Sequence, residues 1–574
     1  MENNPQFGAK FFNKENFSEK KTLHHNLEEH SLSLRKRKNN RQRINELPPD
    51  LLSDFYYKID VSEIEPKICN NQIYIQYKNC SNEKEVLGVL FQMLLSDNDD
   101  IIKFSVAKIR DFLVNTQEKI FLEKKYDDEF NDQLIKFLFE LLFKKTNDLL
   151  LFSNICFLLN KLSTFLNNKK ENNHFYMIYL NYFNDLLNLA QNISTNEPKI
   201  KNALYILLDK IFLCSDDIIN QLEKLYPNYI LQIHSELINL EENKFVKNMA
   251  LISTLLQSIN NCFFNGIYID YFFNNINNTG EINAENIIKF IQKLLNFSYQ
   301  KIIFEQELRC IQNFLYFFMD KEQLFKNKIL KNKVRNMIYD LEFENKILPM
   351  IYDNTINDED LRLIAIQILI NAIFICPKKF CETLIHNNIS EQIIKLENYL
   401  ISQTQFKNKI KDSYLLLLDL IFNLIENESS YIIDNLAIEN NCISLLFKLQ
   451  KIPFYAKEIN SIIKIFNVLI SSNHKYIQTL LISEGICELY KSILEREPKS
   501  EEIETIINNL ILMINYSNNF VNEKFGEKNN DNLILLHLEQ IGFYEAINNL
   551  RSRNDLSEAA ISAINEISSL FNHK

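Results

Sequence analysis

The chain has 574 residues; 46% of them are hydrophobic, only 7 are Gly, and only 10 are Pro. So few turn-forming residues exclude a collagen-like chain and a β-sandwich with a turn about every ten residues, and they favour long helices. The net charge is −11, but residues 1–45 carry ten Lys or Arg and five Glu, so a basic arm precedes a body of net charge −16. An acidic body argues against a body that binds nucleic acid.

The first predicted element is a flexible basic arm, residues 1–47. It begins with a polar stretch that contains Phe12, Asn13 and Lys14, and it continues as EEHSLSLRKRKNNRQRIN from Glu28 to Asn45. The stretch lacks the apolar core of a secretory signal, so we expect a reducing, intracellular compartment. The basic cluster of this arm consists of Arg35, Lys36, Arg37, Lys38, Arg41 and Arg43.

Residues 48–83 are predicted to be a linker, and residues 84–537 to be nine helical repeats. The midpoints of the longest predicted helices recur at intervals of 44 to 60 residues. An all-helical unit of about 45–50 residues is typical of HEAT and armadillo repeats, which bury one continuous core by stacking. We therefore predict an all-α solenoid of about ten armadillo repeats wound as a right-handed superhelix; the alternative is a helical bundle with accidental spacing. The midpoints are Val106, Cys156, Tyr205, Leu251, Ile311, Gln367, Leu415, Ile463, Ile507 and Ala563.

The last predicted element is a carboxy-terminal capping repeat, residues 538–574. It contains LEQIGFYEAINNLRSRNDLSEAAISAINEISSLF, and the start of the repeats contains AKIRDFLVN with Arg110. Together with the Leu34–Lys36 triplet of the arm, these parts, in this order, resemble the importin alpha family. The resemblance implies that the basic cluster binds importin beta and that a groove binds nuclear localisation signal cargo. It also implies that the capping repeat helps to bind an export receptor, and that the protein shuttles between cytoplasm and nucleus.

The resemblance also implies a set of groove residues. In importin alpha the third helix of several repeats carries a Trp and, four residues later, an Asn that clamps an extended cargo backbone. This chain has no Trp, so the slots for Lys stems are lost, and the better-kept Asn positions favour the carboxy-terminal half of the groove. Each candidate could instead be a solvated Asn or a core Tyr. The candidate cargo-binding residues are Asn160, Tyr205, Asp209, Asn371, Asp419 and Asn467.

Other chemistry is not expected. Cys376, Cys381 and His386 are spaced too widely for structural zinc, and so few glycines leave no phosphate-binding loop. No nucleophile elbow or zinc-protease helix occurs. We therefore expect no enzyme activity, no cofactor and no metal. The longest apolar stretch, Leu363 to Cys376, is shorter than the roughly 20 residues that span a membrane, so no membrane partner is expected either.

The leading hypothesis is a nuclear import adaptor that links cargo in an armadillo groove to importin beta through its arm. The first alternative is an armadillo scaffold for protein–protein interaction that is no longer active in import. The second, less favoured, is a nucleic-acid-associated protein that uses the basic stretch from Arg35 to Arg43.

Overall fold

The computed structural model describes two compact units, unit 1 (Met1–Leu255) and unit 2 (Leu256–Lys574). The described residues are 57–115, 128–167, 174–193, 197–238, 240, 248–265, 268, scattered positions between 308 and 338, 344–352, 359–402, 408–426, 430–450, 459–472, 476–496, 498–525 and 532–572. All regular elements among these residues are helical. The arm, with its basic cluster, lies outside the described residues.

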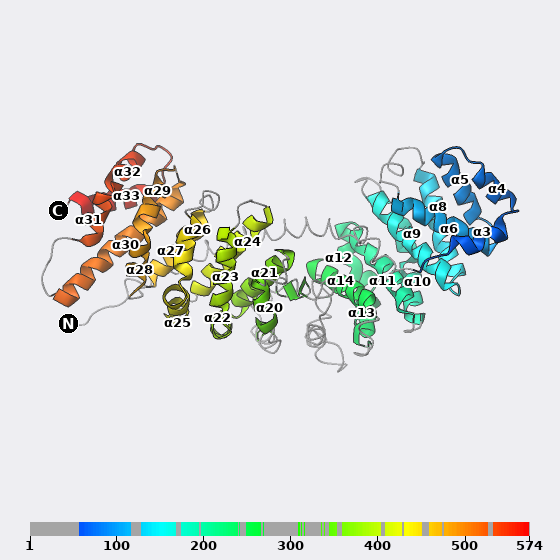
Figure 1. Cartoon of the computed structure of the whole chain (residues 1–574), viewed down its shortest axis with the longest axis horizontal. Helices are drawn as coiled ribbons and strands as arrows, with labels where there is room; N and C mark the ends of the chain where they lie inside the picture. Colours follow the sequence, from blue (N-terminus) through cyan, green and yellow to red (C-terminus); the bar gives the residue numbers. More distant parts are fainter. Residues whose placement is uncertain are drawn as a thin grey trace. The chain divides into compact units, whose positions relative to one another are not determined.

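In its described residues unit 1 consists of α-helices and the 3₁₀ helix η2, with α14 crossing the boundary between the units (Figure 1). Its elements are α3 (Val61–Ile68), α4 (Gln72–Lys78), α5 (Glu83–Leu94), α6 (Asp99–Asn115), α8 (Asp128–Lys144), α9 (Leu149–Asn167), α10 (His174–Asn192), α11 (Pro198–Leu208), η2 (Asp209–Leu213), α12 (Asp216–Leu225), α13 (Asn228–Ile238) and α14 (Met249–Asn265).

The described residues of unit 2 form α-helices and the π-helix η4. Its elements are α20 (Glu344–Ile351), α21 (Glu359–Ile375), α22 (Pro377–His386), α23 (Ile389–Ser402), α24 (Asn408–Ile425), α25 (Ser430–Ile433), η4 (Asp434–Glu439), α26 (Cys442–Gln450), α27 (Ile459–Ser471), α28 (Ile477–Glu484), α29 (Ile486–Leu494), α30 (Ser500–Phe525), α31 (Leu533–Gln540), α32 (Phe543–Arg551) and α33 (Glu558–Asn572).

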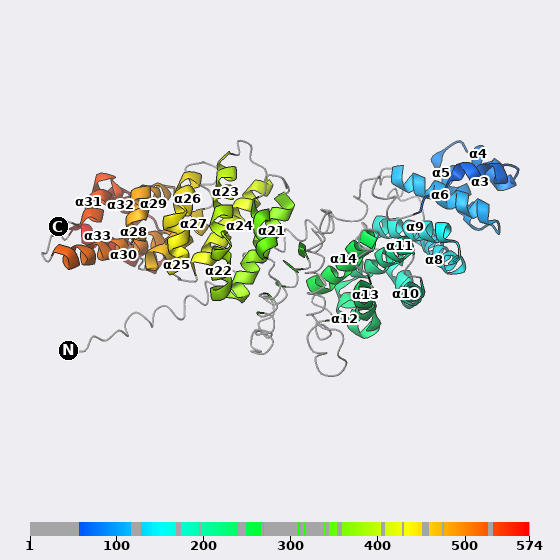
Figure 2. The same ribbon diagram turned by 60° about the horizontal axis from the view of Figure 1, so that its bottom comes forward.

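The longest helices form a row in each unit, which we call the third-helix row. In unit 1, α6 packs on α9 and α9 packs on α11, while Thr254 of α14 donates a hydrogen bond of 2.6 Å to Asn202 of α11. In unit 2, α21, α24, α27, α30 and α33 each pack on the next, as Figures 1 and 2 show. The ten midpoints predicted from the sequence all lie in helical residues. The predicted repeating helical unit is therefore confirmed.

Two of the row helices, α9 and α21, are buried on nearly every side over long stretches because neighbours cover both flanks, whereas α30 and α33 keep an exposed face. All residues from Leu151 to Asn160 in α9 and from Leu361 to Ile373 in α21 are buried. A helix that is apolar all round is a core helix. The shorter helices are amphipathic: α22, for example, buries Phe380, Cys381, Leu384 and Ile385. The stack of repeats thus has its core along the third-helix row.

The chain turns between helices at residues whose chemistry suits the turn. Asn71 and Asn82 cap the amino termini of α4 and α5 with their side chains, which satisfies helix N–H groups that have no partner within the helix. Gly485 and Gly542 precede α29 and α32 with φ of +94° and +73°, a backbone region that favours glycine. These two glycines therefore form turns between helices.

The segment predicted as a linker, residues 48–83, contains two helices. Helix α3 packs on α6 and α4 packs on α5, and these contacts bury Ile64, Ile68 and Tyr74. The structure therefore places residues from Ile59 onward within unit 1. The sequence pattern missed them because α3 has eight residues with Pro66 inside, and α4 has seven. The predicted boundary at residue 538 likewise falls inside α31.

Candidate peptide-binding surface

Side chains of two row helices hold the backbone of Tyr57, just before α3. The hydroxyl of Ser153 on α9 accepts a hydrogen bond of 3.2 Å from the Tyr57 N–H. The Asn154 amide donates one of 2.9 Å to the Tyr57 carbonyl, and Arg110 of α6 donates another of 3.2 Å to the same oxygen. We call Arg110, Ser153 and Asn154 the backbone clamp. It contacts the backbone N–H and the carbonyl of one residue, and its hydrogen bonds do not depend on the side chain of that residue.

The side chain of Tyr57 reaches a third helix of the row. Its hydroxyl donates a hydrogen bond of 3.0 Å to the carboxylate of Glu197, which immediately precedes α11. The Lys199 ammonium lies 5.5 Å from the centre of the ring, within range of a cation–π interaction. Burial, the hydrogen bond to Glu197 and the charge of Glu197 raise the pKa of the Tyr57 phenol. The phenol therefore stays protonated and remains a donor.

Asn154 is the centre of the backbone clamp. It is fully buried, and its carbonyl oxygen accepts a hydrogen bond of 2.7 Å from Arg110. Its amide also donates to the carbonyl of Leu150, at 2.7 Å. Burial lowers the pKa of Arg110 from its ordinary value, and the guanidinium lies 5.8 Å from the ring centre of Phe157. An amide that both donates and accepts can join a cation to a carbonyl, which a hydrocarbon side chain cannot do.

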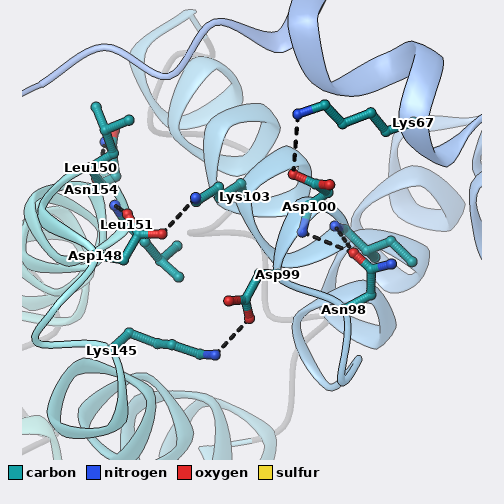
Figure 3. Close-up of polar contacts among 11 residues, drawn as sticks. Lys67, Asn98, Asp99, Asp100, Lys103, Lys145, Asp148, Leu150, Leu151 and Asn154 are labelled. Carbon is teal, nitrogen blue, oxygen red and sulfur yellow. Dashed lines mark hydrogen bonds and ion pairs between the residues drawn. The ribbon is translucent and has the colours of Figure 1, made fainter.

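Ion pairs join α6 to the residue before α9, to the residue after α8 and to α3. Figure 3 shows Lys103 reaching Asp148 at 2.6 Å and Lys145 reaching Asp99 at 2.6 Å, while Lys67 of α3 lies 3.9 Å from Asp100. Asp148 also accepts a hydrogen bond from the Leu151 N–H in the first turn of α9. Pairs with this exposure are each worth about 0–1 kcal/mol. The Lys103–Asp148 pair connects the two helices that carry the clamp.

The candidates predicted in unit 1 lie on other faces. Asn160 is 4% exposed and Tyr205 is fully buried, and the Tyr205 hydroxyl accepts a hydrogen bond of 3.0 Å from Gln232. Tyr205 is therefore a core residue with no exposed ring face to stack on a Lys stem, which corrects that prediction. Asn160 follows Asn154 by six residues, about one and two-thirds helical turns, so it points away from the clamp. Asp209 is half-buried at the junction of α11 and η2.

In unit 2 the three candidates lie on successive helices of the row, and burial distinguishes one of them from the other two. Asn371 of α21 is 1% exposed, and its oxygen accepts a hydrogen bond of 3.0 Å from Gln367, so we no longer expect it to contact cargo. Asp419 of α24 and Asn467 of α27 are half-buried, and Lys464 is exposed. Burial raises the pKa of Asp419 to about 7, and the charge of Lys464 opposes this rise.

We expect the replacement Lys464→Met to raise the pKa of Asp419 further, because it removes the cation that favours the ionised carboxylate. The measurement is an NMR titration of the full chain with aspartate labelled at its carboxyl carbon. Lys448→Met, a change of an exposed lysine on α26, is the control and should leave the titration near pH 7. A carboxyl that titrates near pH 4 in both variants contradicts this assignment.

Sequence reasoning found Arg110 only through a family resemblance and missed Ser153, Asn154, Glu197 and Lys199. Ser153 and Asn154 are polar residues in an otherwise apolar run, LLLFSNICFLL. Two adjacent polar residues in the middle of a core helix indicate a hydrogen-bonded contact with another segment, because buried polar groups need partners. The run itself does not indicate that the partner is Tyr57, which lies 96 residues before Ser153 in the sequence.

Other chemical sites are not evident in the described residues. Within these ranges no group of three or more His, Cys, Asp or Glu could hold a metal ion, and each described cysteine is a free thiol. Cys376 and Cys381 are buried there, and burial raises the pKa of Cys381 to about 12. None of the helices among the described residues is long and apolar enough to cross a membrane.

The comparisons with known proteins show the fold. No family model matches the chain, and no curated protein is similar to it in sequence. A chain from a solved structure on a phosphorylation switch that controls the interaction between cadherin and beta-catenin has a TM-score of 0.52 and 11% identity, and the match covers 89% of this chain and 94% of that one. The chain has the fold of an armadillo- or HEAT-type solenoid. The predicted all-α solenoid class is therefore confirmed.

Two further matches are weaker. SYS-1 has a TM-score of 0.42 at 12% identity, over 91% of this chain and 94% of that one. Importin beta has a TM-score of 0.41 at 11% identity, over 89% of this chain and 55% of that one. At these identities the likeness is one of fold alone. The resemblance to importin alpha is not confirmed.

Proposed function

We propose that this chain is a protein-binding scaffold whose third-helix row receives extended segments of partner proteins. The observation that carries the proposal is the backbone clamp at Tyr57. Side chains of α6 and α9 satisfy the N–H and the carbonyl of one residue, and this is how a helical surface can bind an extended chain without reading its sequence. No catalytic step, cofactor or metal is part of the proposal.

The more specific proposal is an import adaptor of the importin alpha type. Three sequence features support it: the basic cluster of the arm, the order of the parts along the chain, and a net charge of −16 for the body. Asp419 and Asn467, on neighbouring row helices, are the remaining candidates for contact with a basic cargo signal in unit 2. Importin beta, cargo with a nuclear localisation signal, and an export receptor at the last repeat are the proposed partners, with shuttling between cytoplasm and nucleus.

The arm decides between the adaptor and a scaffold without a role in import. We expect purified importin beta to bind the full-length chain, and expect the simultaneous replacement of the six residues of the basic cluster with Ala to weaken binding at least 100-fold. Each exposed charge pair is weak, so affinity comes from the whole cluster. Binding measured by fluorescence anisotropy at physiological salt is the readout.

The control variant replaces six exposed basic residues of the solenoid and should bind like the parent. Equal binding by the arm variant, or none by the parent, would leave a scaffold outside import as the remaining proposal. Salt-sensitive binding of the parent to RNA or DNA, lost in the arm variant, would instead support the nucleic-acid alternative. The control residues are Lys78, Lys224, Lys378, Arg496, Lys499 and Arg551.

A further inference from the structure

The surroundings of Tyr57 are more selective than a backbone clamp requires. The clamp on α6 and α9 would hold any extended residue, yet Glu197 accepts a hydrogen bond from the phenol and Lys199 lies over the ring. We define Glu197 and Lys199 as the tyrosine subsite. The hydrogen bonds that join Tyr57 to the row span 53 to 140 residues of sequence, so the segment contacts the row as a separate stretch of chain.

The contacts of Tyr57 are separate from those that hold the helix that follows it. Tyr57 is half-buried, Lys58 and Asp60 are exposed, and Ile59 is buried. Helix α3 begins at Val61 with Asp60 as its cap and keeps its own anchors, since Ile64 and Ile68 are buried. The bonds that hold Tyr57 come from side chains of the row, so another extended segment could take up the same bonds.

We propose that the clamp and the tyrosine subsite together bind an unmodified tyrosine in an extended segment of a partner, and that Tyr57 occupies this site in cis. The inference rests on the proposed function and names the ligand class of one site. A phenylalanine would leave the Glu197 carboxylate without this donor, and such a loss weakens binding about tenfold or more. A phosphotyrosine would bring a second negative charge against Glu197, so the site rejects it.

The probe is a fluorescent peptide of the chain's own sequence, residues 51–60, LLSDFYYKID, in three forms that carry Tyr, Phe or phosphotyrosine at the position of Tyr57. It is titrated into the full-length parent and into the variant Tyr57→Ala, which keeps the backbone groups of residue 57 but lacks the competing ring and hydroxyl. We expect the variant to bind the Tyr peptide at least tenfold more tightly than the parent does. It should bind the Phe peptide about tenfold more weakly than the Tyr peptide, and the phosphotyrosine peptide not measurably.

Two further variants test the residues named. Adding Glu197→Ala to Tyr57→Ala should bring the Tyr and Phe peptides to equal affinity. Glu197 is half-buried just before α11, so this change leaves the packing of the core unchanged. Adding Asn154→Ala should abolish binding, with circular dichroism as the check on folding. Tyr476→Ala, a change of a tyrosine that is 58% exposed in unit 2, is the matched control and should bind like the parent.

The inference is overturned if Tyr57→Ala binds the Tyr peptide no more tightly than the parent, or if the Tyr, Phe and phosphotyrosine peptides bind it equally. Either result would make the Tyr57 contacts purely structural. The outcome is separate from the importin beta experiment, which depends on the arm. Failure of arm binding together with tyrosine-selective peptide binding would reject the adaptor and keep this site.

Discussion

Replacing Glu236 with Ala is expected to lower the free energy of unfolding of unit 1 by about 3–5 kcal/mol. The Glu236 carboxylate on α13 pairs with the Lys201 ammonium on α11 at 2.5 Å, and the two side chains are only 13% and 3% exposed. Without its partner, the Lys201 side chain would have no carboxylate beside it in a place that is only 3% exposed. Removing one member of a buried pair leaves an uncompensated charge, which is the costly case.

The matched control replaces both partners. Lys201→Met with Glu236→Leu keeps the volume and removes both charges, so we expect a free energy of unfolding within about 1 kcal/mol of the parent. Because the chain has two units, the readout is native-state hydrogen exchange at the amides of α11 and α13. A double variant as unstable as Glu236→Ala would show that the hydrocarbon stems and not the charges matter. A loss under about 1 kcal/mol in the single variant would contradict the buried pair.

The second large effect concerns Glu397 on α23, and here we expect stabilisation. Its side chain is fully buried, and neither carboxyl oxygen has a hydrogen-bond partner among the described residues. Helix α23 packs on α20, α22, α24 and α26, so the carboxyl lies inside unit 2. Burial raises the pKa of Glu397 well above its ordinary value. Replacing it with Leu should raise the free energy of unfolding by about 1–3 kcal/mol at neutral pH.

The raised pKa gives this effect a pH dependence with a definite sign. The folded protein holds the Glu397 proton more tightly than the unfolded chain does. Its contribution to stability is therefore largest below the ordinary pKa of Glu, and it is lost as pH rises through the raised value. The gain from Glu397→Leu should consequently grow from pH 5 to pH 8. Glu397→Gln removes the titration and should flatten the profile.

The control is on the same helix. Glu391 is exposed and pairs with Lys395 at 2.7 Å, so Glu391→Gln should change stability by under about 0.5 kcal/mol at any pH. Chemical denaturation followed by hydrogen exchange in α23 and α26 measures both variants. If Glu397→Leu destabilises unit 2 throughout the pH range, the carboxyl has a partner and the assignment is wrong.

The fold could be predicted from the sequence because its signal is local. Several row helices contain a long apolar run, and a run such as ICFLLNKL in α9 stands out without knowledge of what covers it. Stacking repeats at a steady interval then gives the architecture. Short helices gave no such signal: the pattern of α3 extends over eight residues.

The candidate site could not be predicted in the same way. Every residue from Leu151 to Asn160 is buried, so hydrophobicity does not distinguish the face that receives Tyr57. Aligning α9 with a family motif selected Asn160, although Asn154 makes the contacts to Tyr57. The choice between two asparagines less than two turns apart depends on a segment about one hundred residues away, and no single-sequence pattern encodes that contact.

The packing of the third-helix row determines how far the effect of a substitution on stability extends along unit 2. In unit 2 each row helix packs chiefly on the row helices before and after it, so the unit behaves as a chain of local couplings. A substitution in α23 should change the opening of α20, α24 and α26, and its effect should fade before α33. A ligand that spans two or three row helices would then do more than fill a site: by joining neighbours that otherwise open separately, it would make that stretch of the solenoid open as one cooperative unit.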